Sequence, residues 1–294
     1  MDETFRLLFV GDLHYQVQDR GALLCSRTVE LWRTLLASLR HDPPRAIIQV
    51  GDLIDGYHLP VDTCKADFRL ITSELRQAPC PVHALIGNHE VIYLPDRPFL
   101  SGTLAVEDFS RVVELGPLRL VMFDLTVDDE SHGSFSPARA AWLEAALTAR
   151  PAKPCVVVQH QLIHPTDALC THRHFVHESE TYRRFLASRP EVKLIVTGHR
   201  HIPTLHHLGS TPQVTLSAFC SWPFTLCELH VHPARRSIEL RERPLEEFIG
   251  ERLNASLPKW MDQSRRLLVE KNPAVWGQRE RMSPELKRVA ATWT

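Results

Sequence analysis

Five short polar motifs occur in order along the first two thirds of the chain. They are Asp12-Leu13-His14, Gly51-Asp52-Leu53-Ile54-Asp55, Gly87-Asn88-His89-Glu90, Gln159-His160 and Gly198-His199-Arg200-His201. Carboxylates, imidazoles and an amide oxygen together suit divalent first-row metals of intermediate hardness, such as Mn, Fe, Co or Zn. No cysteine belongs to the set, so a closed structural zinc site is not expected. The candidate ligands exceed what one ion needs. This predicts two ions that share a bridging ligand, for which Asp52 on its glycine turn is the natural choice.

Each motif follows an apolar run whose residues are typical of a buried strand. The runs lie at 5–14, where the strand ends in the first motif, and at 46–50, 82–86, 155–158 and 192–196. Apolar residues at helical spacing predict helices at 22–40, 62–77, 136–149 and 179–188. This alternation predicts parallel strands joined by right-handed crossovers, and such sheets bind ligands beyond the carboxyl ends of their strands. We therefore expect the motifs to meet at one edge.

The remaining segments carry weaker signals. Prolines at 95, 98 and 117 interrupt 91–118, which we interpret as a loop over the site followed by a short return to a strand at 119–123. Four segments predict antiparallel strands that form a second sheet packed on the first: 204–207, 213–218, 224–232 and 237–241. We assign residues 1–241 to the catalytic domain and 242–294 to a helical extension, in which Ser283-Pro284 is a typical helix start.

The composition is that of a soluble globular protein, with 294 residues, 44% of them apolar and 23% charged. A formal net charge of -1 argues against a protein that wraps nucleic acid electrostatically. The apolar run from Leu7 to Val10 is too short for a signal peptide or a membrane span. The seven cysteines are scattered without a CxxC pair, which is typical of reduced thiols. We expect a cytoplasmic protein whose partner is a small molecule rather than a membrane or nucleic acid.

In this order the motifs resemble those of the calcineurin-like metallophosphoesterase superfamily: Asp-x-His, Gly-Asp-x-x-Asp, Gly-Asn-His-Glu, a strand-end His and Gly-His-x-His. The resemblance covers residues 5 to about 240 and is nearest, in motif spacing, to the bacterial class III cyclic-nucleotide phosphodiesterases. It implies an α/β fold, a four-layer αββα sandwich of two mixed sheets flanked by helices. Relatives in that branch are often dimers, so a homodimer is one expectation for the oligomeric state.

The resemblance also implies a dinuclear centre with one set of side chains for each ion, which would be Mn, Fe or Zn. The first set is Asp12, His14, Asp52 and His201, and the second is Asp52, Asn88, His160 and His199. Gln159-His160 stands where the family often has two adjacent histidines, which leaves His164 as a competitor for that ligand role. Asp55 occupies the position at which the purple acid phosphatases carry a tyrosine ligand, which argues against that branch.

Catalytic roles are implied by the same resemblance. His89 is expected beside the scissile phosphate as a general acid, oriented by Asp55, which would also raise the imidazole pKa. Asn88, His89 and Arg200 are the expected substrate contacts. Two ions would hold a bridging hydroxide that attacks phosphorus in line. The implied activity is hydrolysis of a phosphodiester, or else a phosphomonoester, in a small substrate such as a cyclic nucleotide.

Three other functions stay open from the sequence. A DNA-repair-type nuclease or a phosphomonoesterase of the same superfamily would use the same centre, whereas an inactive scaffold would keep the fold without competent metals. The scaffold hypothesis predicts lost ligands, and all seven are present. The histidines at 172, 174 and 177 form either a solvated loop, a substrate lid or a third metal site. Trp222 and Phe224 either wall a substrate pocket or pack in the core.

Overall fold

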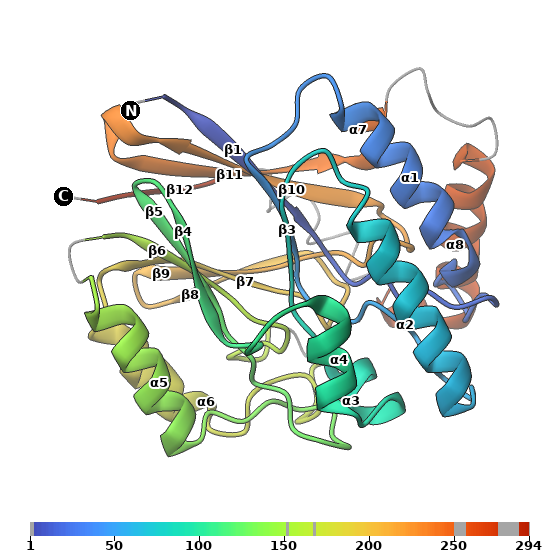
Figure 1. Cartoon of the computed structure of the whole chain (residues 1–294), viewed down its shortest axis with the longest axis horizontal. Helices are drawn as coiled ribbons and strands as arrows, with labels where there is room; N and C mark the ends of the chain where they lie inside the picture. The colour runs from blue at the N-terminus through green and yellow to red at the C-terminus, as the bar shows by residue number, and fades with distance from the viewer. Residues whose placement is uncertain (1–2, 151–152, 167–168, 250–256, 276–287, 294) are drawn as a thin grey trace.

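Two six-stranded mixed β-sheets form the centre of the molecule. The structure, a computed structural model, describes all residues except 1–2, 151–152, 167–168, 250–256, 276–287 and 294. The two sheets lie face to face, and helices cover their outer faces (Figure 1). This arrangement confirms the predicted α/β fold, a four-layer αββα sandwich.

The first sheet combines parallel and antiparallel strands in the order β12-β11-β10-β1-β2-β3. Its strands are β1 (Phe5–Val10), β2 (Ala46–Gln49), β3 (Val82–Ala84), β10 (Thr225–His232), β11 (Ser237–Pro244) and β12 (Val289–Thr292). β1, β2 and β3 pair in parallel, as their alternation with helices predicts, whereas β10 runs antiparallel to β1. The carboxyl ends of β1, β2 and β3 therefore meet at one edge of this sheet.

The second sheet has the order β4-β5-β6-β7-β9-β8. Its strands are β4 (Arg111–Leu115), β5 (Leu118–Met122), β6 (Cys155–Val158), β7 (Val192–Thr197), β8 (Thr204–Leu208) and β9 (Thr211–Thr215). The four central strands are parallel, and the edge strands β4 and β8 are antiparallel to their neighbours. All of β6 and nearly all of β7 are buried, which explains their continuous apolar sequences.

Helices pack on the outer face of each sheet. α1 (Thr28–Leu39) and α2 (Val61–Leu75) cover the first sheet, and α5 (Pro137–Thr148) and α6 (Ser179–Ala187) cover the second (Figure 1). The other helices are η1 (Cys25–Arg27), α3 (Asn88–Tyr93), α4 (Arg97–Leu104), η2 (Pro233–Arg235), α7 (Leu245–Ile249) and α8 (Leu257–Lys271). Between the sheets, fully buried side chains such as Phe9, Ile48, Val158 and Val196 form a continuous apolar core. This core fixes the two sheets against each other.

The prediction that 203–241 forms a second sheet by itself was wrong. Strands β8 and β9 extend the sheet of β7, whereas β10 and β11 cross to the first sheet, where β10 pairs with β1. Each hairpin fills an available sheet edge, and an antiparallel sequence pattern does not specify which edge that is.

The segment 91–118 is also more regular than the predicted loop. The Asp96 side chain accepts a hydrogen bond from the Phe99 backbone N–H (3.1 Å) at the start of α4, and Pro98 lies in the first helical turn. Pro98 thus lies at the start of a helix instead of breaking one.

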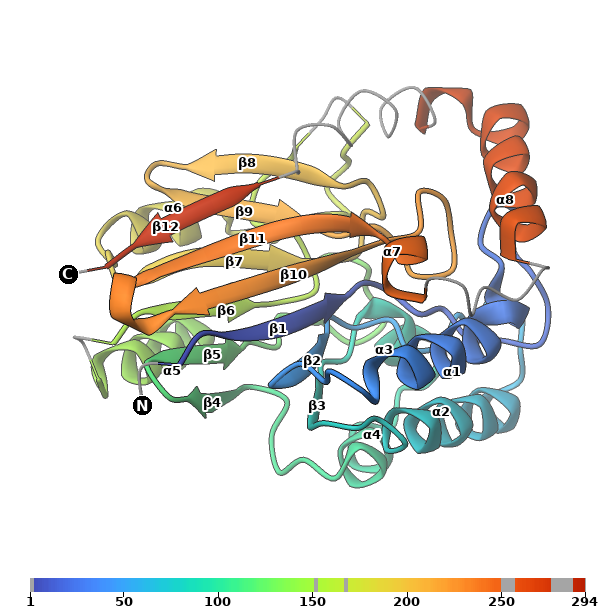
Figure 2. The ribbon, with the colours of Figure 1, turned by 90° about the horizontal axis from the view of Figure 1, so that it is seen from above.

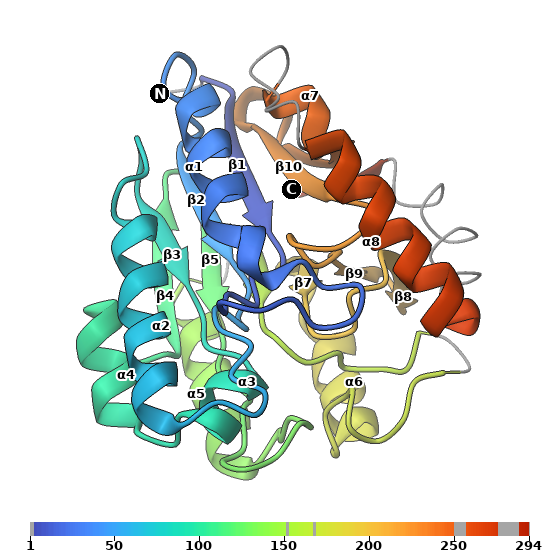
Figure 3. The ribbon, with the colours of Figure 1, turned by 90° about the vertical axis from the view of Figure 1, so that its right-hand side faces the viewer.

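The C-terminal segment contains helices and one strand. α8 lies beside the loop that follows β1 (Figures 2 and 3). The Ser264 hydroxyl of this helix donates to the Ala22 carbonyl of the loop (2.7 Å). After α8, the chain returns to the first sheet as β12, which pairs antiparallel with β11. The helix start predicted at Ser283-Pro284 lies outside the described residues.

Candidate metal centre

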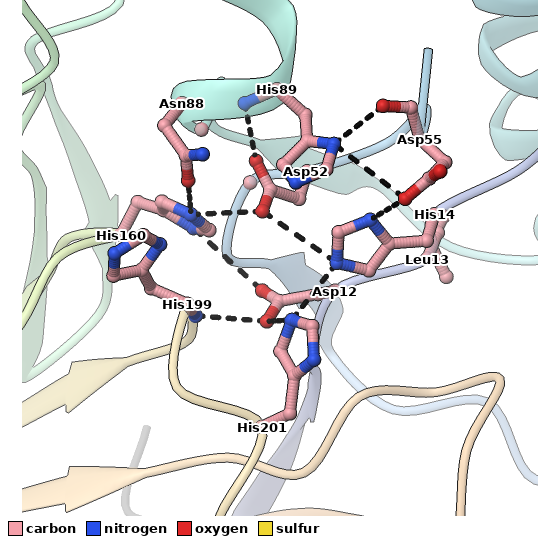
Figure 4. A network of polar contacts seen from close by, with 12 residues as sticks. Asp12, Leu13, His14, Asp52, Asp55, Asn88, His89, His160, His199 and His201 are labelled. Atoms are coloured by element: carbon pink, nitrogen blue, oxygen red, sulfur yellow. Dashed lines mark hydrogen bonds and ion pairs between the residues drawn. The ribbon is translucent and has the colours of Figure 1, made fainter. Parts of the chain in front are cut away.

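The five motifs converge at the carboxyl ends of strands from both sheets (Figure 4). The residues after β1, β2 and β3 come from the first sheet, and those after β6 and β7 come from the second. The side chains that meet are Asp12, His14, Asp52, Asp55, Asn88, His89, His160, His199 and His201. Residues as distant in the sequence as Asp12 and His201 thus share one site.

Potential donor atoms form two groups that share one carboxylate. One group is Asp12, His14, Asp52 and His201, and the other is Asp52, His160 and His199. A further group, His14, Asp55 and His89, shares His14 with the first. Within each group, the donor atoms lie within 4.8 Å of one another. Asn88 adjoins the second group, because its Oδ1 lies 3.0 Å from His160 Nε2. The structure therefore brings together the same two sets that the family resemblance implied, and their roles as ligands stay a prediction.

The atoms of the first group fit a divalent cation. His14 Nε2 lies 2.9 Å from His201 Nε2, so two imidazole nitrogens face each other with carboxylates beside them. His201 Nε2 also lies 2.9 Å from Asp12 Oδ2, and His14 Nε2 lies 3.6 Å from Asp52 Oδ2. The buried Asp12 Oδ1 has no hydrogen-bond partner among the described residues. An ion here would satisfy these oxygen and nitrogen atoms with the mixed donor set that first-row metals accept.

Glycines before the ligands allow the loops of the two sheets to approach closely. A Cβ on Gly51, whose φ is +104°, would lie 2.7 Å from His160 Nδ1. A Cβ on Gly87 would lie 2.2 Å from Asp52 Oδ1, and one on Gly198 would lie 2.2 Å from Asp12 Oδ1. Any side chain at these positions would displace a candidate ligand residue. The glycines of these three motifs are therefore needed for the geometry of the centre.

Four of the donors have left-handed backbone conformations that non-glycine residues seldom adopt. They are His14 (φ 46°), Asp52 (φ 53°), His199 (φ 67°) and His201 (φ 57°). Each such residue costs of order 1 kcal/mol or more and persists only where the surroundings enforce it. The concentration of these conformations in one cluster indicates a site selected for geometry rather than for stability.

Hydrogen bonds between the loops orient the candidate metal ligands. His160 Nδ1 donates to the Val50 carbonyl (2.9 Å), which turns Nε2 towards Asp52 Oδ2 at 3.2 Å. The backbone N–H of His199 donates to Asp12 Oδ2 (2.8 Å), and that of His89 donates to Asp52 Oδ1 (2.9 Å). Such contacts behind the donors fix both the tautomer of an imidazole and the direction of its lone pair.

Burial and the charges of neighbouring side chains shift the pKa values of the candidate ligands. Burial raises the pKa of Asp12 to about 6. For His160, burial acts to lower the pKa, but Asp52 and Asp12 outweigh it and the pKa rises to about 9. Burial and the neighbouring His160 lower the pKa of His199 to about 3. The protein thus balances its buried carboxylates with imidazole protons, which bound cations would replace. Metal affinity is therefore expected to fall as the pH falls.

His89 lies beside both groups, but Asp55 does not hold it as predicted. Its Nδ1 donates to the backbone carbonyl of Asp55, while the Asp55 carboxylate is 3.6 Å away. That carboxylate lies closer to His14 Nδ1 (3.1 Å) and to Arg20 Nη2 (2.6 Å), so it mainly orients a candidate ligand. Asp55 acts to raise the pKa of His89, as predicted, but burial outweighs the nearby carboxylates and the pKa is lowered.

Glu90 organises two of the loops, a role that the sequence analysis missed. Its carboxylate accepts from the backbone N–H groups of Gly87 (2.7 Å), Asp52 (3.1 Å) and Ile54 (3.0 Å). Its place in the third motif, three residues after the start of a helix-forming turn, is a sequence signal for such capping. By contrast, nothing in the sequence around Arg20 indicates its ion pair with Asp55.

The positions of His164 and Phe224 bear on two alternatives that the sequence left open. The ring of His164 packs against that of His206, with centroids 4.9 Å apart, so the geometry favours His160 in the second group. Phe224 is 1% exposed and belongs to the core, whereas Trp222 is half-buried. A contact between Arg200 and the substrate stays a prediction.

The histidine-rich loop after β6 reaches the centre partly through its backbone. The carbonyl of Arg173 accepts a hydrogen bond from His199 Nε2 (2.9 Å), and the His174 ring lies 5.7 Å from the His199 ring. His177 instead stacks on His132, with ring centroids 3.5 Å apart, and His172 is exposed. Among the described residues, these loop histidines do not form a third metal cluster.

Comparison with known proteins identifies the family. Residues 5–203 match the calcineurin-like phosphoesterase family, and the chain belongs to it. It is 25% identical over 200 residues to the 3',5'-cyclic adenosine monophosphate phosphodiesterase CpdA of Escherichia coli K12, covering 67% of this chain and 69% of that protein. It is 22% identical over 266 residues to a probable glycerophosphodiester phosphodiesterase, GpdQ, of Arcobacter nitrofigilis, covering 86% and 88%.

A solved structure with the same fold is that of a dimetal phosphatase from Danio rerio. The TM-score is 0.68 at 18% identity, and the match covers 82% of this chain and 96% of the other. Family membership and the converging donors together define a metal-dependent phosphoester hydrolase of a dinuclear superfamily. No helix in the described part of the chain is both long enough and apolar enough to cross a membrane.

Proposed function

We propose that this enzyme hydrolyses phosphodiester bonds of small substrates, with cyclic nucleotides as the first class to test. The observation that carries the proposal is the pair of donor groups that share Asp52, with His89 beside them. The names of the similar CpdA and GpdQ proteins, both phosphodiesterases, support a diester rather than a monoester. We propose Mn, Fe or Zn for the two ions.

Two divalent ions, when bound, neutralise charge on the phosphoryl oxygens and lower the pKa of coordinated water. The protein contributes the arrangement in which this happens. Asp12, His14 and His201 would hold one ion, Asn88, His160 and His199 would hold the other, and Asp52 would contact both. Because these side chains are oriented by backbone hydrogen bonds before substrate arrives, little reorganisation is needed during the reaction.

His89 is placed to handle the proton of the leaving group. Its Nδ1 is fixed by the Asp55 carbonyl, so Nε2 is the nitrogen left to face a substrate, and the side chain is 13% exposed. Burial lowers its pKa, but a phosphoryl anion next to the ring would favour the imidazolium form. In that form His89 would donate a proton to the departing alkoxide, a role worth about 10²–10⁴-fold in rate.

A diphosphatase is the second candidate function. A bovine protein that is 25% identical over 224 residues is named a manganese-dependent ADP-ribose/CDP-alcohol diphosphatase; the match covers 54% of this chain and 64% of that protein. Such an enzyme would use the same centre on a diphosphate linkage. The nuclease and scaffold alternatives gain no specific support from the arrangement of the donors.

The test is turnover by metal-stripped protein to which Mn²⁺, Fe²⁺, Co²⁺ or Zn²⁺ is returned singly. The substrates are bis(p-nitrophenyl) phosphate, p-nitrophenyl phosphate, a 3',5'-cyclic nucleotide and ADP-ribose, with Asn88→Ala as the inactive control. Metal-dependent hydrolysis of the diesters above the monoester is expected. Preference for p-nitrophenyl phosphate would contradict the proposal in favour of a phosphomonoesterase, and preference for ADP-ribose would favour the diphosphatase.

A further inference from the structure

Two tyrosine rings continue outwards from His89. Tyr93 follows His89 by four residues on α3, so the two side chains lie on one helix face, with ring centroids 5.3 Å apart. Tyr57 lies on the loop after β2, and its ring is 6.3 Å from that of Tyr93 in an edge-on arrangement. A path of rings therefore leads from the site to the surface.

The approach of this loop to α3 requires a glycine. Gly56 has a φ of +66°, and a Cβ at this position would lie only 2.6 Å from the Cβ of Tyr93. Gly56 directly follows Asp55, whose carboxylate contacts His14 and whose carbonyl holds His89. The position of Tyr57 is thus tied to the candidate ligand loop within two residues.

Arg20 and the neighbouring His58 also contact the Tyr57 ring, and the His58 ring centroid lies 3.8 Å from that of Tyr57. The guanidinium carbon of Arg20 lies 5.4 Å from the centre of the Tyr57 ring, a cation–π contact. Its Nη2 lies 2.6 Å from Asp55 Oδ1, so the positive charge is already paired with a buried carboxylate. This pairing suits Arg20 to fixing the tyrosine rather than to binding a substrate phosphate.

Tyr57 remains exposed although it is held at a defined place. The residue is 42% exposed, whereas no other Phe, Tyr or Trp in the described residues is classed as exposed. Contacts with Tyr93, Arg20 and His58 hold the ring in place, and the part that stays exposed offers a surface on which a planar ring can stack. Aromatic side chains bind nucleobases and other planar rings in this way, with little dependence on the identity of the ring.

We propose that Tyr57, positioned by Arg20 and Tyr93, is the specificity-determining residue that stacks on a planar ring of the substrate beside the phosphoryl group. The preferred substrate class is then a phosphodiester that carries a nucleobase or an aryl group, rather than one with alkyl substituents only. This inference rests on the proposed phosphodiesterase function and defines its substrate class. It requires no chemical step beyond hydrolysis.

The experiment compares wild-type protein with Tyr57→Ala, Tyr57→Phe and the control Val112→Ala, all with Mn²⁺. Val112 is 38% exposed on β4, outside the site. kcat/KM is measured for a 3',5'-cyclic nucleotide, for bis(p-nitrophenyl) phosphate and for glycerophosphoethanolamine, which has no ring. In Tyr57→Ala, kcat/KM for each ring-bearing substrate divided by kcat/KM for glycerophosphoethanolamine should fall about tenfold, as loss of one stacked ring predicts. Tyr57→Phe and Val112→Ala should keep the wild-type ratio. A ratio within twofold of wild type in Tyr57→Ala would overturn the inference.

Equilibrium binding separates this inference from the proposed function. Calorimetry with AMP and with inorganic phosphate measures how much affinity the nucleoside adds in each variant. In Tyr57→Ala, the affinity for AMP relative to that for inorganic phosphate should fall about tenfold, while Tyr57→Phe should keep the wild-type value. If wild-type protein hydrolyses none of the diesters, the proposed function fails, yet the AMP measurement still decides the role of Tyr57. Equal AMP preference in wild type and Tyr57→Ala would overturn it.

Discussion

The two sheets contribute differently to the candidate centre. The first sheet supplies every oxygen donor and one imidazole: Asp12, His14, Asp52 and Asn88. The second sheet supplies three imidazoles: His160, His199 and His201. The donors from the first sheet are at most 4% exposed, whereas those after β7 are half-buried. The first sheet therefore forms the closed side of the site, which carries the carboxylates, and the second completes it with imidazoles.

Each sheet also orients donors that belong to the other. Asp12 from the first sheet accepts from the backbone of His199, and His160 from the second sheet donates to the carbonyl of Val50. The centre therefore exists only when the two sheets are stacked by their shared core. This explains how loops distant in sequence can be positioned precisely enough for a two-ion site.

Replacing the shared carboxylate should have the largest effect. Asp52→Asn removes the one charged side chain common to both donor groups, and kcat/KM for bis(p-nitrophenyl) phosphate should fall by about 10⁴-fold, or about 5 kcal/mol. The matched control is Asp67→Asn, which neutralises another buried carboxylate, on α2 away from the centre. Steady-state kinetics with added Mn²⁺ would measure both. Activity of Asp52→Asn within tenfold of wild type would contradict a shared ligand.

Replacing a donor from the second sheet should affect one ion more than the other. His160→Ala should lower activity by about 10²–10³-fold and reduce bound Mn²⁺ towards one ion per chain, because the first group stays complete. His164→Ala, whose ring packs on His206 instead, should stay within about threefold of wild type. Metal analysis and kinetics would separate the two. A larger loss in His164→Ala would reverse the assignment.

His89 lies outside both proposed ligand sets, so its removal should change the chemistry without emptying the site. His89→Ala should slow hydrolysis of glycerophosphoethanolamine by about 10²-fold, because its alkoxide leaving group needs a proton. Hydrolysis of bis(p-nitrophenyl) phosphate should fall less, because p-nitrophenolate leaves without protonation. Parallel kinetics on the two substrates would measure the difference. Equal losses on both would argue for a structural role of this imidazole.

The smallest effect is expected from replacing Glu228, a buried carboxylate of the first sheet outside the centre. This change should lower the free energy of unfolding without changing activity. Burial acts to raise the pKa of Glu228, but Arg6 (2.8 Å) and His230 (2.9 Å) outweigh it and lower the pKa. A lowered folded-state pKa stabilises the protein above the unfolded pKa of about 4.3, and this contribution disappears as the pH falls through the folded value. Glu228→Gln should therefore lose about 1–3 kcal/mol at pH 7.

Urea unfolding at pH 7 and pH 3.5 would check this sign. The difference in unfolding free energy between wild type and Glu228→Gln should be smaller at the lower pH. A difference that stays constant or grows at pH 3.5 would contradict the electrostatic explanation, and altered kcat/KM in the variant would contradict its separation from the site.

The sequence predicted the parts of the fold that depend on local pattern. Buried runs followed by polar motifs, with helical spacing between them, were enough to place β1, β2, β3, β6 and β7 and the motifs at their carboxyl ends, but not to show that β6 and β7 belong to the second sheet. The partners of β8 to β11 were not predictable, because alternating residues specify a strand but not the sheet that it joins. Helix α4 was missed because Pro98 reads as an interruption unless the Asp96 cap is recognised.

The parts of the site that belong to sequence motifs were predictable. Those that depend on a single contact between distant residues were not. The two donor groups follow from motif order and family resemblance. The preference of Asp55 for His14 over His89 depends on distances of a few tenths of an ångström, and its ion pair with Arg20 joins loops whose proximity no pattern records. The pKa of His89 depends on burial by the assembled loops, which is a property of the fold.

The most direct test of a dinuclear centre formed by two sheets is the number of ions bound. Metal-stripped wild-type protein would be titrated with Mn²⁺ in a calorimeter, and the metal content after removal of free ions would be determined independently. Two ions per chain are predicted for wild type, with His160→Ala retaining one. A single ion in wild type, or two ions in both proteins, would contradict the shared-carboxylate arrangement.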